Sequence, residues 1–270
     1  MKLSFSTLGC PDWTWGEVVS AAKDWGFDGV EVRGLQSELC APEIEEFSAG
    51  KIETTKAQLR SLGLAIPVLA SGAVLAEKDK AQDSFIEACA YIELASKLGV
   101  AYVRVMGTGQ PDITAGDFKL AAGLYGRLCE YGKKLGVTPL IETNGDLASS
   151  EAMRSFLNRA CCGNCGVLWD VHHTVRFGTE SPLETVAALG GLIKHVHLKD
   201  SMMSGYKTVY KMMGDGDVPV AEALKLLKAL RYDGFASLEW VKRWNPDLQE
   251  EPGLVFAHYK SYMDAILRTL

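Results

Sequence analysis

Residues 79–105 read DKAQDSFIEACAYIELASKLGVAYVRV, and this stretch contains the unit that decides the fold. A helical pattern covers Asp79–Leu98, and Gly99 follows as the left-handed residue that commonly ends a helix. The short apolar run Ala101–Val105 then has the character of a strand. The unit is therefore a helix, a glycine and a strand.

The same unit recurs along the chain. A helical pattern from Thr114 to Leu135 ends at Gly136, and another from Trp15 to Trp25 ends at Gly26. The strand-like runs are Leu3–Leu8, Gly29–Val32, Ala65–Ala70, Ala101–Val105, Pro139–Thr143, Val167–Asp170, Ile193–Leu198 and Phe235–Trp240. Strands that alternate with helices run parallel, because the helix supplies the crossover that a parallel connection needs. Eight such units predict an α/β protein with a (β/α)8 TIM barrel, forming one domain over residues 1–270.

The competing fold is an open, doubly wound sheet. That fold would carry a glycine-rich phosphate turn, G-x-G-x-x-G, after its first strand. The chain has Leu8-Gly9-Cys10-Pro11 at that place, and Gly107-Thr108-Gly109 after the fourth strand is too short for the fingerprint. The barrel is therefore favoured.

Composition argues against several classes of protein. The 270 residues include 28 Lys and Arg against 34 Asp and Glu, a formal net charge of −6, whereas a dedicated nucleic-acid binder normally has a basic surplus. A hydrophobic share of 47% predicts a globular chain. The longest apolar stretch, residues 64–76, is interrupted by Pro67, Ser71 and Gly72 and is too short to span a membrane. We expect neither nucleic acid nor a membrane as a partner.

The N-terminus and the cysteines predict a cytoplasmic protein. Residues 1–9 alternate like a strand and lack the apolar core of a secretory signal. The seven cysteines are an odd number and are expected to be reduced thiols. The stretch Cys161-Cys162-Gly163-Asn164-Cys165 contains one C-x-x-C, but it precedes a strand and no second pair completes a zinc site. We therefore expect these cysteines to be structural.

Polar side chains close four consecutive predicted strands, the fifth to the eighth. In a barrel, the carboxyl ends of the strands face the mouth of the active site. The four residues that can converge there are Glu142, Asp170, His197 and Glu239. Three carboxylates packed together repel one another unless a cation or protons intervene. This donor set predicts one divalent metal ion per chain, namely Mn, Mg, Co or Zn, whereas each residue taken singly could be a solvated charge.

Several motifs stand at these strand ends. They are Glu-x-Asn at 142–144, Trp-Asp-x-x-His at 169–173, His-x-His-Leu-Lys-Asp at 195–200, Gly-Asp-Gly at 214–216 and Leu-Glu-Trp at 238–240, preceded by GFDGVEVR at 26–33. Together they resemble the xylose isomerase-like TIM-barrel superfamily, which contains the sugar phosphate isomerase/epimerase family, over essentially the whole chain. The resemblance implies a divalent metal on the four residues above, with His173 touching the substrate. Many members have a His where this chain has Asn144, so the role of that His is not carried over.

The superfamily also contains apurinic endonucleases with a cluster of three zinc ions. Such a cluster needs several histidines from earlier strands. This chain has five histidines, and all of them lie in its second half. A nuclease is therefore not expected.

The predicted site fits isomerisation or epimerisation of a sugar or polyol next to a carbonyl, through a metal-bound enediolate. Glu142 and Glu239 would act as the base and the acid on opposite faces of the substrate. The alternative is a dehydratase or lyase acting on a keto-cyclitol, keto-sugar or related hydroxy compound, because the same proton abstraction eliminates a β-hydroxyl. Arg104 and Lys199 resemble cations of such dehydratases, although each could instead pair with a carboxylate.

The remaining expectations concern the substrate and the loops. The substrate-binding candidates are His173, Arg104, Lys199, Trp13 and Asn144. Asp215 and Asp217 lie where barrels often bind phosphate, which favours an unphosphorylated substrate. The long segment 201–217 is either a lid over the site or, through its Met and Tyr residues, a contact in a homo-oligomer. Nothing in the sequence selects one sugar, one metal or one oligomeric state.

Overall fold

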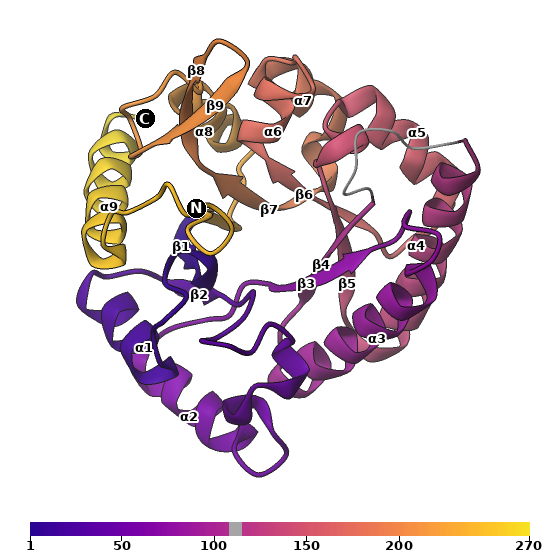
Figure 1. Ribbon diagram of the computed structural model, residues 1–270, viewed down its shortest axis with the longest axis horizontal. Helices are drawn as coiled ribbons and strands as arrows, with labels where there is room; N and C mark the ends of the chain where they lie inside the picture. The colour runs from indigo at the N-terminus through magenta and orange to yellow at the C-terminus, as the bar shows by residue number, and fades with distance from the viewer. Residues whose placement is uncertain (108–114) are drawn as a thin grey trace.

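Eight parallel strands form the central sheet, with the spatial order β2-β1-β10-β7-β6-β5-β4-β3 (Figure 1). The computed structural model describes residues 1–107 and 115–270. The strands are β1 (Lys2–Ser6), β2 (Gly29–Glu31), β3 (Leu69–Val74), β4 (Tyr102–Met106), β5 (Thr138–Glu142), β6 (Gly166–Asp170), β7 (Ile193–Leu198) and β10 (Phe235–Leu238). Hydrogen bonds also join the two edges of the sheet: Val30 N–H donates to Ala65 O at 2.9 Å, and Ala70 N–H donates to Val32 O at 2.8 Å. The predicted single-domain TIM barrel is confirmed.

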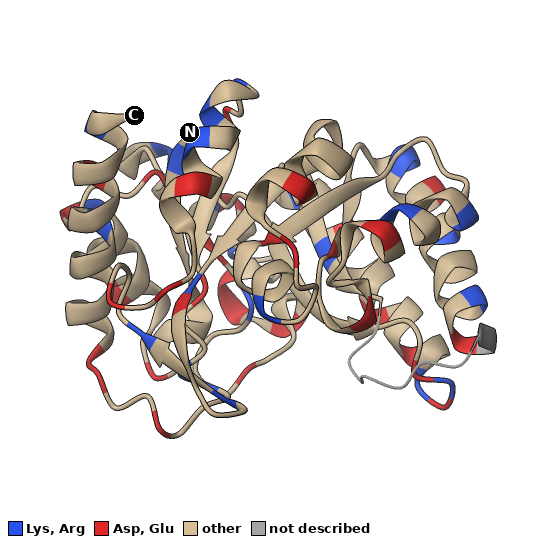
Figure 2. Cartoon of the chain, turned by 90° about the horizontal axis from the view of Figure 1, so that it is seen from above, with Lys and Arg blue, Asp and Glu red and all other residues tan. Residues whose placement is uncertain are grey.

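Helices surround the sheet on its outer side (Figure 1). They are α1 (Trp15–Asp24), α2 (Ile52–Leu62), α3 (Ala81–Leu98), α4 (Ala115–Leu135), α5 (Ser150–Ala160), α6 (Val171–Arg176), α7 (Pro182–Leu189), α8 (Val220–Ala229) and α9 (Pro252–Thr269). Short 3-10 turns cover Thr7–Gly9, Ala41–Glu43, Glu45–Phe47, Gly145–Leu147 and Gly190–Leu192. Gly99 and Gly136 have φ angles of 76° and 71°, which confirms the left-handed helix ends. Acidic and basic residues are interspersed over the helices (Figure 2).

Some boundaries differ from the sequence prediction, and two of them have a local cause. The sequence predicts the third strand at 65–70, but β3 begins at Leu69, because Pro67 has no N–H to donate to a strand ladder. The first strand ends at Ser6, whose side chain accepts a hydrogen bond from Leu8 N–H and starts a 3-10 turn. The predicted helix start at Thr114 and the turn residues Thr108 and Gly109 lie outside the described residues.

The segment 201–217, predicted as a long loop that forms a lid or an oligomer contact, belongs largely to a β-hairpin. Strands β8 (Asp200–Ser204) and β9 (Lys207–Lys211) pair in antiparallel fashion, with Ser204 opposite Lys207. Gly205, with φ of 60°, opens the two-residue turn between them, where glycine is favoured. The Asp200 carboxylate accepts hydrogen bonds from the N–H groups of Gly214 (2.9 Å) and Gly216 (3.0 Å), and these bonds fix the segment that follows β9. The Gly-Asp-Gly motif is thus fixed by the Asp of the His-Leu-Lys-Asp motif.

One stability prediction follows from the close approach of the strands. A Cβ added at Gly29 would lie 2.6 Å from Ala65 O and 2.9 Å from the ring of Phe235. We expect Gly29→Ala to lower the free energy of unfolding by about 1–3 kcal/mol, the usual cost of overpacking. The matched control is Gly50→Ala, because a Cβ there meets no described atom within 4 Å. Denaturant unfolding of both variants measures the difference, and equal effects would contradict the expected clash.

Candidate metal and active site

The candidate site lies at the carboxyl ends of the strands, around a cavity of about 460 Å³. The side chains that line it are Leu8, Arg33, Arg104, Met106, Glu142, Asn144, His173, Lys199, Tyr210, Glu239, Val241, Trp244 and Asn245. This lining includes four of the five substrate-binding candidates. The fifth, Trp13, packs instead against Trp25 and Phe256, with ring centroids 6.2 and 5.7 Å away. An aromatic residue after a strand can cover the core or face the cavity, and Trp13 does the former.

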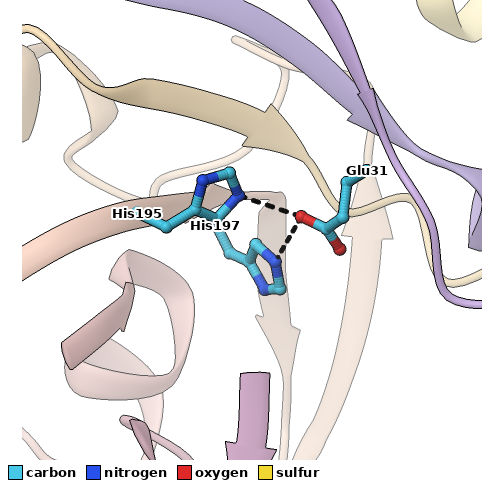
Figure 3. A group of neighbouring side chains, drawn as sticks. All are labelled: Glu31, His195 and His197. Carbon is cyan, nitrogen blue, oxygen red and sulfur yellow. Dashed lines mark hydrogen bonds and ion pairs between the residues drawn. The ribbon is translucent and has the colours of Figure 1, made fainter. Parts of the chain in front are cut away.

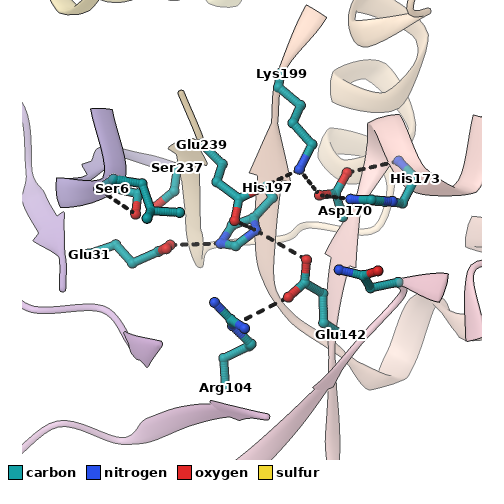
Figure 4. Close-up of polar contacts among 12 residues, drawn as sticks. Ser6, Glu31, Arg104, Glu142, Asp170, His173, His197, Lys199, Ser237 and Glu239 are labelled. Atoms are coloured by element: carbon teal, nitrogen blue, oxygen red, sulfur yellow. Dashed lines mark hydrogen bonds and ion pairs between the residues drawn. The ribbon is translucent and has the colours of Figure 1, made fainter. Parts of the chain in front are cut away.

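The four residues at the strand ends come together in space (Figure 4). Glu142 ends β5, Asp170 ends β6 and Glu239 directly follows β10. The register of β6 with β7 pairs Asp170 with His197. One ligand atom from each of the four lies within 4.8 Å of those of the other three, and all four side chains are buried. The predicted convergence of these residues is therefore present in the fold.

His197 is oriented toward the three carboxylates by Glu31. Its Nε2 lies 2.8 Å from Glu31 Oε2, while its Nδ1 lies 3.4 Å from Glu239 Oε1 and 3.8 Å from Glu142 Oε1 (Figure 3, Figure 4). Among the described residues, this Nδ1 has no hydrogen-bond partner. One ring nitrogen is thus anchored, and the other is presented to the carboxylate cluster. This is the arrangement in which a histidine ligand is commonly held for a metal ion.

Glu31 is the residue of this site that sequence reasoning missed. It ends β2, is fully buried, and its Oε2 also lies 3.0 Å from His195 Nε2 (Figure 3). Burial opposes ionisation of Glu31, but attraction to His197 and hydrogen bonding to both histidines outweigh it and hold the pKa well below the ordinary value. Burial also opposes charging of His197, yet Glu31 and Glu239 raise its pKa well above the ordinary value. His197 is therefore charged and pairs with Glu31, and a cation that binds Nδ1 would displace the proton from this nitrogen, because a histidine ligand is neutral.

Lys199 lies between two of the carboxylates. Its Nζ is 2.5 Å from Asp170 Oδ2 and also contacts Glu239 Oε2, and the side chain is buried (Figure 4). Burial disfavours the ammonium, but Asp170 and Glu239 raise the pKa of Lys199 above its ordinary value. Burial likewise opposes ionisation of Asp170, and Lys199 more than compensates, so the pKa of Asp170 is lowered. Lys199 thus balances charge in the cluster as well as lining the cavity.

Two arginines share the same cavity. Arg104 Nε lies 3.3 Å from Glu142 Oε2. Burial opposes ionisation of Glu142, but the charges of Arg104 and then His197 outweigh it and lower the pKa of Glu142 to about 2. Arg33 stacks over the ring of Trp244, with its guanidinium carbon 5.6 Å from the ring centroid. Burial and the positive charge of Arg104 both lower the pKa of Arg33. The cavity is therefore lined by cationic as well as acidic groups.

His173 and Asn144 complete the lining. His173 Nε2 lies 3.6 Å from Asp170 Oδ2, and burial lowers the pKa of His173 despite the attraction of Asp170, so the ring is neutral near pH 7. The backbone N–H of His173 donates to Asp170 Oδ1 at 2.9 Å, which makes Asp170 the N-cap of α6. Asn144 follows β5 and contacts Met106 Sδ at 4.0 Å. Asp217, one of the two acidic residues that lie where barrels often bind phosphate, forms an ion pair with Arg176.

Comparison with known proteins agrees with this architecture. The sequence profile described as xylose isomerase-like TIM barrel matches residues 19–257. The chain belongs to this family. Within its described residues, the helices are all too short or too polar to cross a membrane. An uncharacterized protein of Methanocaldococcus jannaschii is 29% identical over 112 residues, which span 41% of this chain and 38% of that protein.

Several solved structures superpose over nearly the full chain. The probable 3-DHS dehydratase AsbF of Bacillus anthracis is 18% identical with a TM-score of 0.81, covering 98% of this chain and 99% of that one. D-psicose 3-epimerase of Clostridium cellulolyticum, in a complex with D-tagatose, is 15% identical with a TM-score of 0.78, covering 99% of both chains. The IOLI protein with a bound zinc atom is 17% identical with a TM-score of 0.82, covering 100% and 99%. At these identities the likeness establishes the fold.

Proposed function

We propose that this protein is a divalent-metal-dependent isomerase or epimerase of a sugar or polyol. The observation that carries the proposal is the meeting of Glu142, Asp170 and Glu239 with His197, whose Nδ1 has no hydrogen-bond partner among the described residues. Glu142 and Glu239 of this group line the cavity. Epimerases and a dehydratase share the fold, so an enzyme of this kind is the expected class.

The residues present fit a divalent cation. Glu142, Asp170, His197 and Glu239 would hold it, because three carboxylates and one imidazole suit Mn, Mg, Co or Zn. When bound, such a cation supplies Lewis-acid stabilisation of negative charge on substrate oxygens. The Glu31 carboxylate contacts Nε2 of His197 at 2.8 Å and so leaves Nδ1 as the ring nitrogen that faces the cluster.

The side chains of the site supply the proton transfers. Glu142 and Glu239 arrive from different strands, β5 and the end of β10, and both approach Nδ1 of His197, so that one would remove a proton from a carbon and the other would return one. Arg104 keeps Glu142 ionised, as a base requires. Neutral His173 and Asn144 line the cavity and would contact substrate hydroxyls.

Proton exchange in D2O tests this function. The protein, supplied with Mn²⁺, is incubated with a panel of ketoses, aldoses and keto-cyclitols, and the deuterium content of the recovered compounds is measured by NMR. The proposal expects deuterium at the carbon next to the carbonyl for at least one neutral sugar, without loss of water. Exchange at no member of the panel, with metal bound, would contradict it.

A dehydratase or lyase acting on a carboxylated keto-cyclitol or keto-sugar is the second candidate, and the two arginines favour it. Arg33 and Arg104 both line the cavity, and burial together with the positive charge of Arg104 lowers the pKa of Arg33. A bound carboxylate would relieve that repulsion, because guanidinium groups bind carboxylates through paired hydrogen bonds. Loss of water from such a substrate in the same assay would identify this reaction.

Replacing Arg33 distinguishes the two substrate classes. If the substrate carries a carboxylate, we expect Arg33→Gln to raise KM about 10- to 100-fold, the usual loss of a charged hydrogen bond. For a neutral sugar, KM should change less than about threefold, since no charged hydrogen bond is lost. Arg60→Gln, on the exposed side of α2, is the matched control. Steady-state kinetics on both substrate classes gives the answer, and an unchanged KM for the carboxylated substrate would exclude this role of Arg33.

The hairpin of β8 and β9 is proposed to close over the substrate. Tyr210 of β9 lines the cavity and stacks on His172 with ring centroids 5.5 Å apart, so the hairpin already reaches the site. Its outer residues Met202, Met203 and Tyr206 are exposed and would be the ones buried if the chain forms a homo-oligomer. We also propose that the protein is cytoplasmic.

A further inference from the structure

A group of cysteines lies at the opposite end of β6 from Asp170, away from the cavity described above. Cys129 is on α4 and fully buried, and Cys162 follows the end of α5 and is half-buried. Their Sγ atoms lie 3.0 Å apart. Cys165, directly before β6, donates a hydrogen bond from its Sγ to Cys162 O at 3.4 Å. All seven cysteines of the chain are free thiols.

The local fold brings the two sulfurs together. Gly126 of α4 permits close packing, because a Cβ there would lie 2.7 Å from Ala160 O at the end of α5. Asn164 then fixes the following loop: its Nδ2 donates to Cys129 O at 3.2 Å and to Val137 O at 2.9 Å. The thiols are thus held in contact by the backbones that carry them.

The two thiols, Cys129 and Cys162, differ in pKa and in access to solvent. The hydrogen bond between the two thiols lowers the pKa of Cys162 to about 7, although burial opposes this, while the same contact and burial raise the pKa of Cys129. Cys162 also borders a surface cavity of about 520 Å³, together with Cys161 and Arg127. A thiolate that solvent can reach, beside a second thiol, is the usual arrangement of an oxidisable pair.

We propose that Cys129 and Cys162 form a peroxide-oxidisable dithiol that closes to an intramolecular disulfide. The Cys162 thiolate attacks one oxygen of hydrogen peroxide, the O–O bond breaks, and a sulfenic acid and, after protonation, water result. The Cys129 sulfur then attacks the Cys162 sulfur, the S–O bond breaks, and hydroxide leaves and takes up the Cys129 proton as a second water. The peroxide is reduced and two thiols are oxidised. The sulfurs need to approach by only about 1 Å to reach bonding distance.

Thiol counting and peptide mapping test the proposal on the wild-type protein. The protein is treated with hydrogen peroxide, denatured, alkylated, digested and analysed by mass spectrometry. We expect the free thiols to fall from seven by two, to five, with Cys129 linked to Cys162 and full recovery in dithiothreitol. Seven remaining thiols, a Cys162–Cys165 link or an intermolecular disulfide would each overturn the proposal.

Variants assign the order of the two steps. Cys162→Ser should abolish the loss of thiols, whereas Cys161→Ser, at the adjacent exposed position, should leave it unchanged. In Cys129→Ser, Cys162 should accumulate as a sulfenic acid that dimedone traps. Circular dichroism checks that each variant is folded. If Cys129→Ser does not fold, the peptide map of the wild-type protein still decides the proposal. Equal disulfide formation in Cys162→Ser would contradict the assignment.

Discussion

Glu142→Gln and Glu239→Gln should each lower kcat by about 10²- to 10⁴-fold, the usual contribution of a general acid or base. Gln keeps the shape of the side chain but can neither accept nor return the proton. Both carboxylates line the cavity and approach the same ring nitrogen of His197, so each is within reach of one bound substrate. The measurement is the turnover of the substrate identified by deuterium exchange, at saturating Mn²⁺.

The design must separate proton transfer from metal binding, because both residues are also proposed ligands. Bound Mn²⁺ is therefore quantified in the same samples, and rates are compared only where it is retained. Glu250→Gln, on an exposed residue, is the control and should keep the wild-type rate. Unchanged turnover in both site variants with metal still bound would rule out the proposed acid and base.

Lys199→Met should have the largest effect on stability. The substitution keeps most of the volume of the side chain but removes a positive charge that contacts both Asp170 and Glu239. Two buried carboxylates then lose the ammonium that they share, and removing one partner of a buried ion pair costs about 3–5 kcal/mol. We expect that decrease in the free energy of unfolding of the EDTA-treated protein, measured with denaturant at pH 7.

A divalent cation should offset much of this loss. Because the cation would sit among the same carboxylates, saturating Mn²⁺ should stabilise Lys199→Met more than the wild type. Lys207→Met removes an exposed pair with Asp247 and should change the stability by less than about 1 kcal/mol in either condition. A decrease for Lys199→Met that is small, or that Mn²⁺ does not alter, would argue against a cation site at Asp170 and Glu239.

The barrel and the meeting of four strand-end residues were predictable from the sequence, and the reason is geometric. Parallel strands end at one face, so Glu142, Asp170 and His197 had to approach one another once the alternation of helix and strand was recognised. The same rule applies to Glu31 at the end of β2, which lies at the same face of the sheet. A carboxylate that ends a short buried strand is therefore the signal by which the sequence marks this residue, and the structure adds its contact with His197.

Other features depend on packing that no local pattern encodes. Trp13 after β1 could face the cavity or the core, and the rings of Trp25 and Phe256 decide for the core. Lys199 was expected near the substrate or in an ion pair, and it does line the cavity, but its contact with two carboxylates at once follows from the register of β6, β7 and β10. The contact between Cys129 and Cys162 likewise arises from the packing of α4 against α5, which brings together two residues that are far apart in the sequence.

The most direct test of the central claim is the number of divalent cations bound per chain. Equilibrium dialysis against Mn²⁺ compares the wild type with Asp170→Asn, which removes a ligand charge but still caps α6, since Asn and Asp are comparable N-caps. Asp215→Asn, at an exposed position, is the control. The account predicts one bound ion per chain in the wild type and the control, and its loss in Asp170→Asn. No bound ion in the wild type, or equal binding in Asp170→Asn, would contradict it.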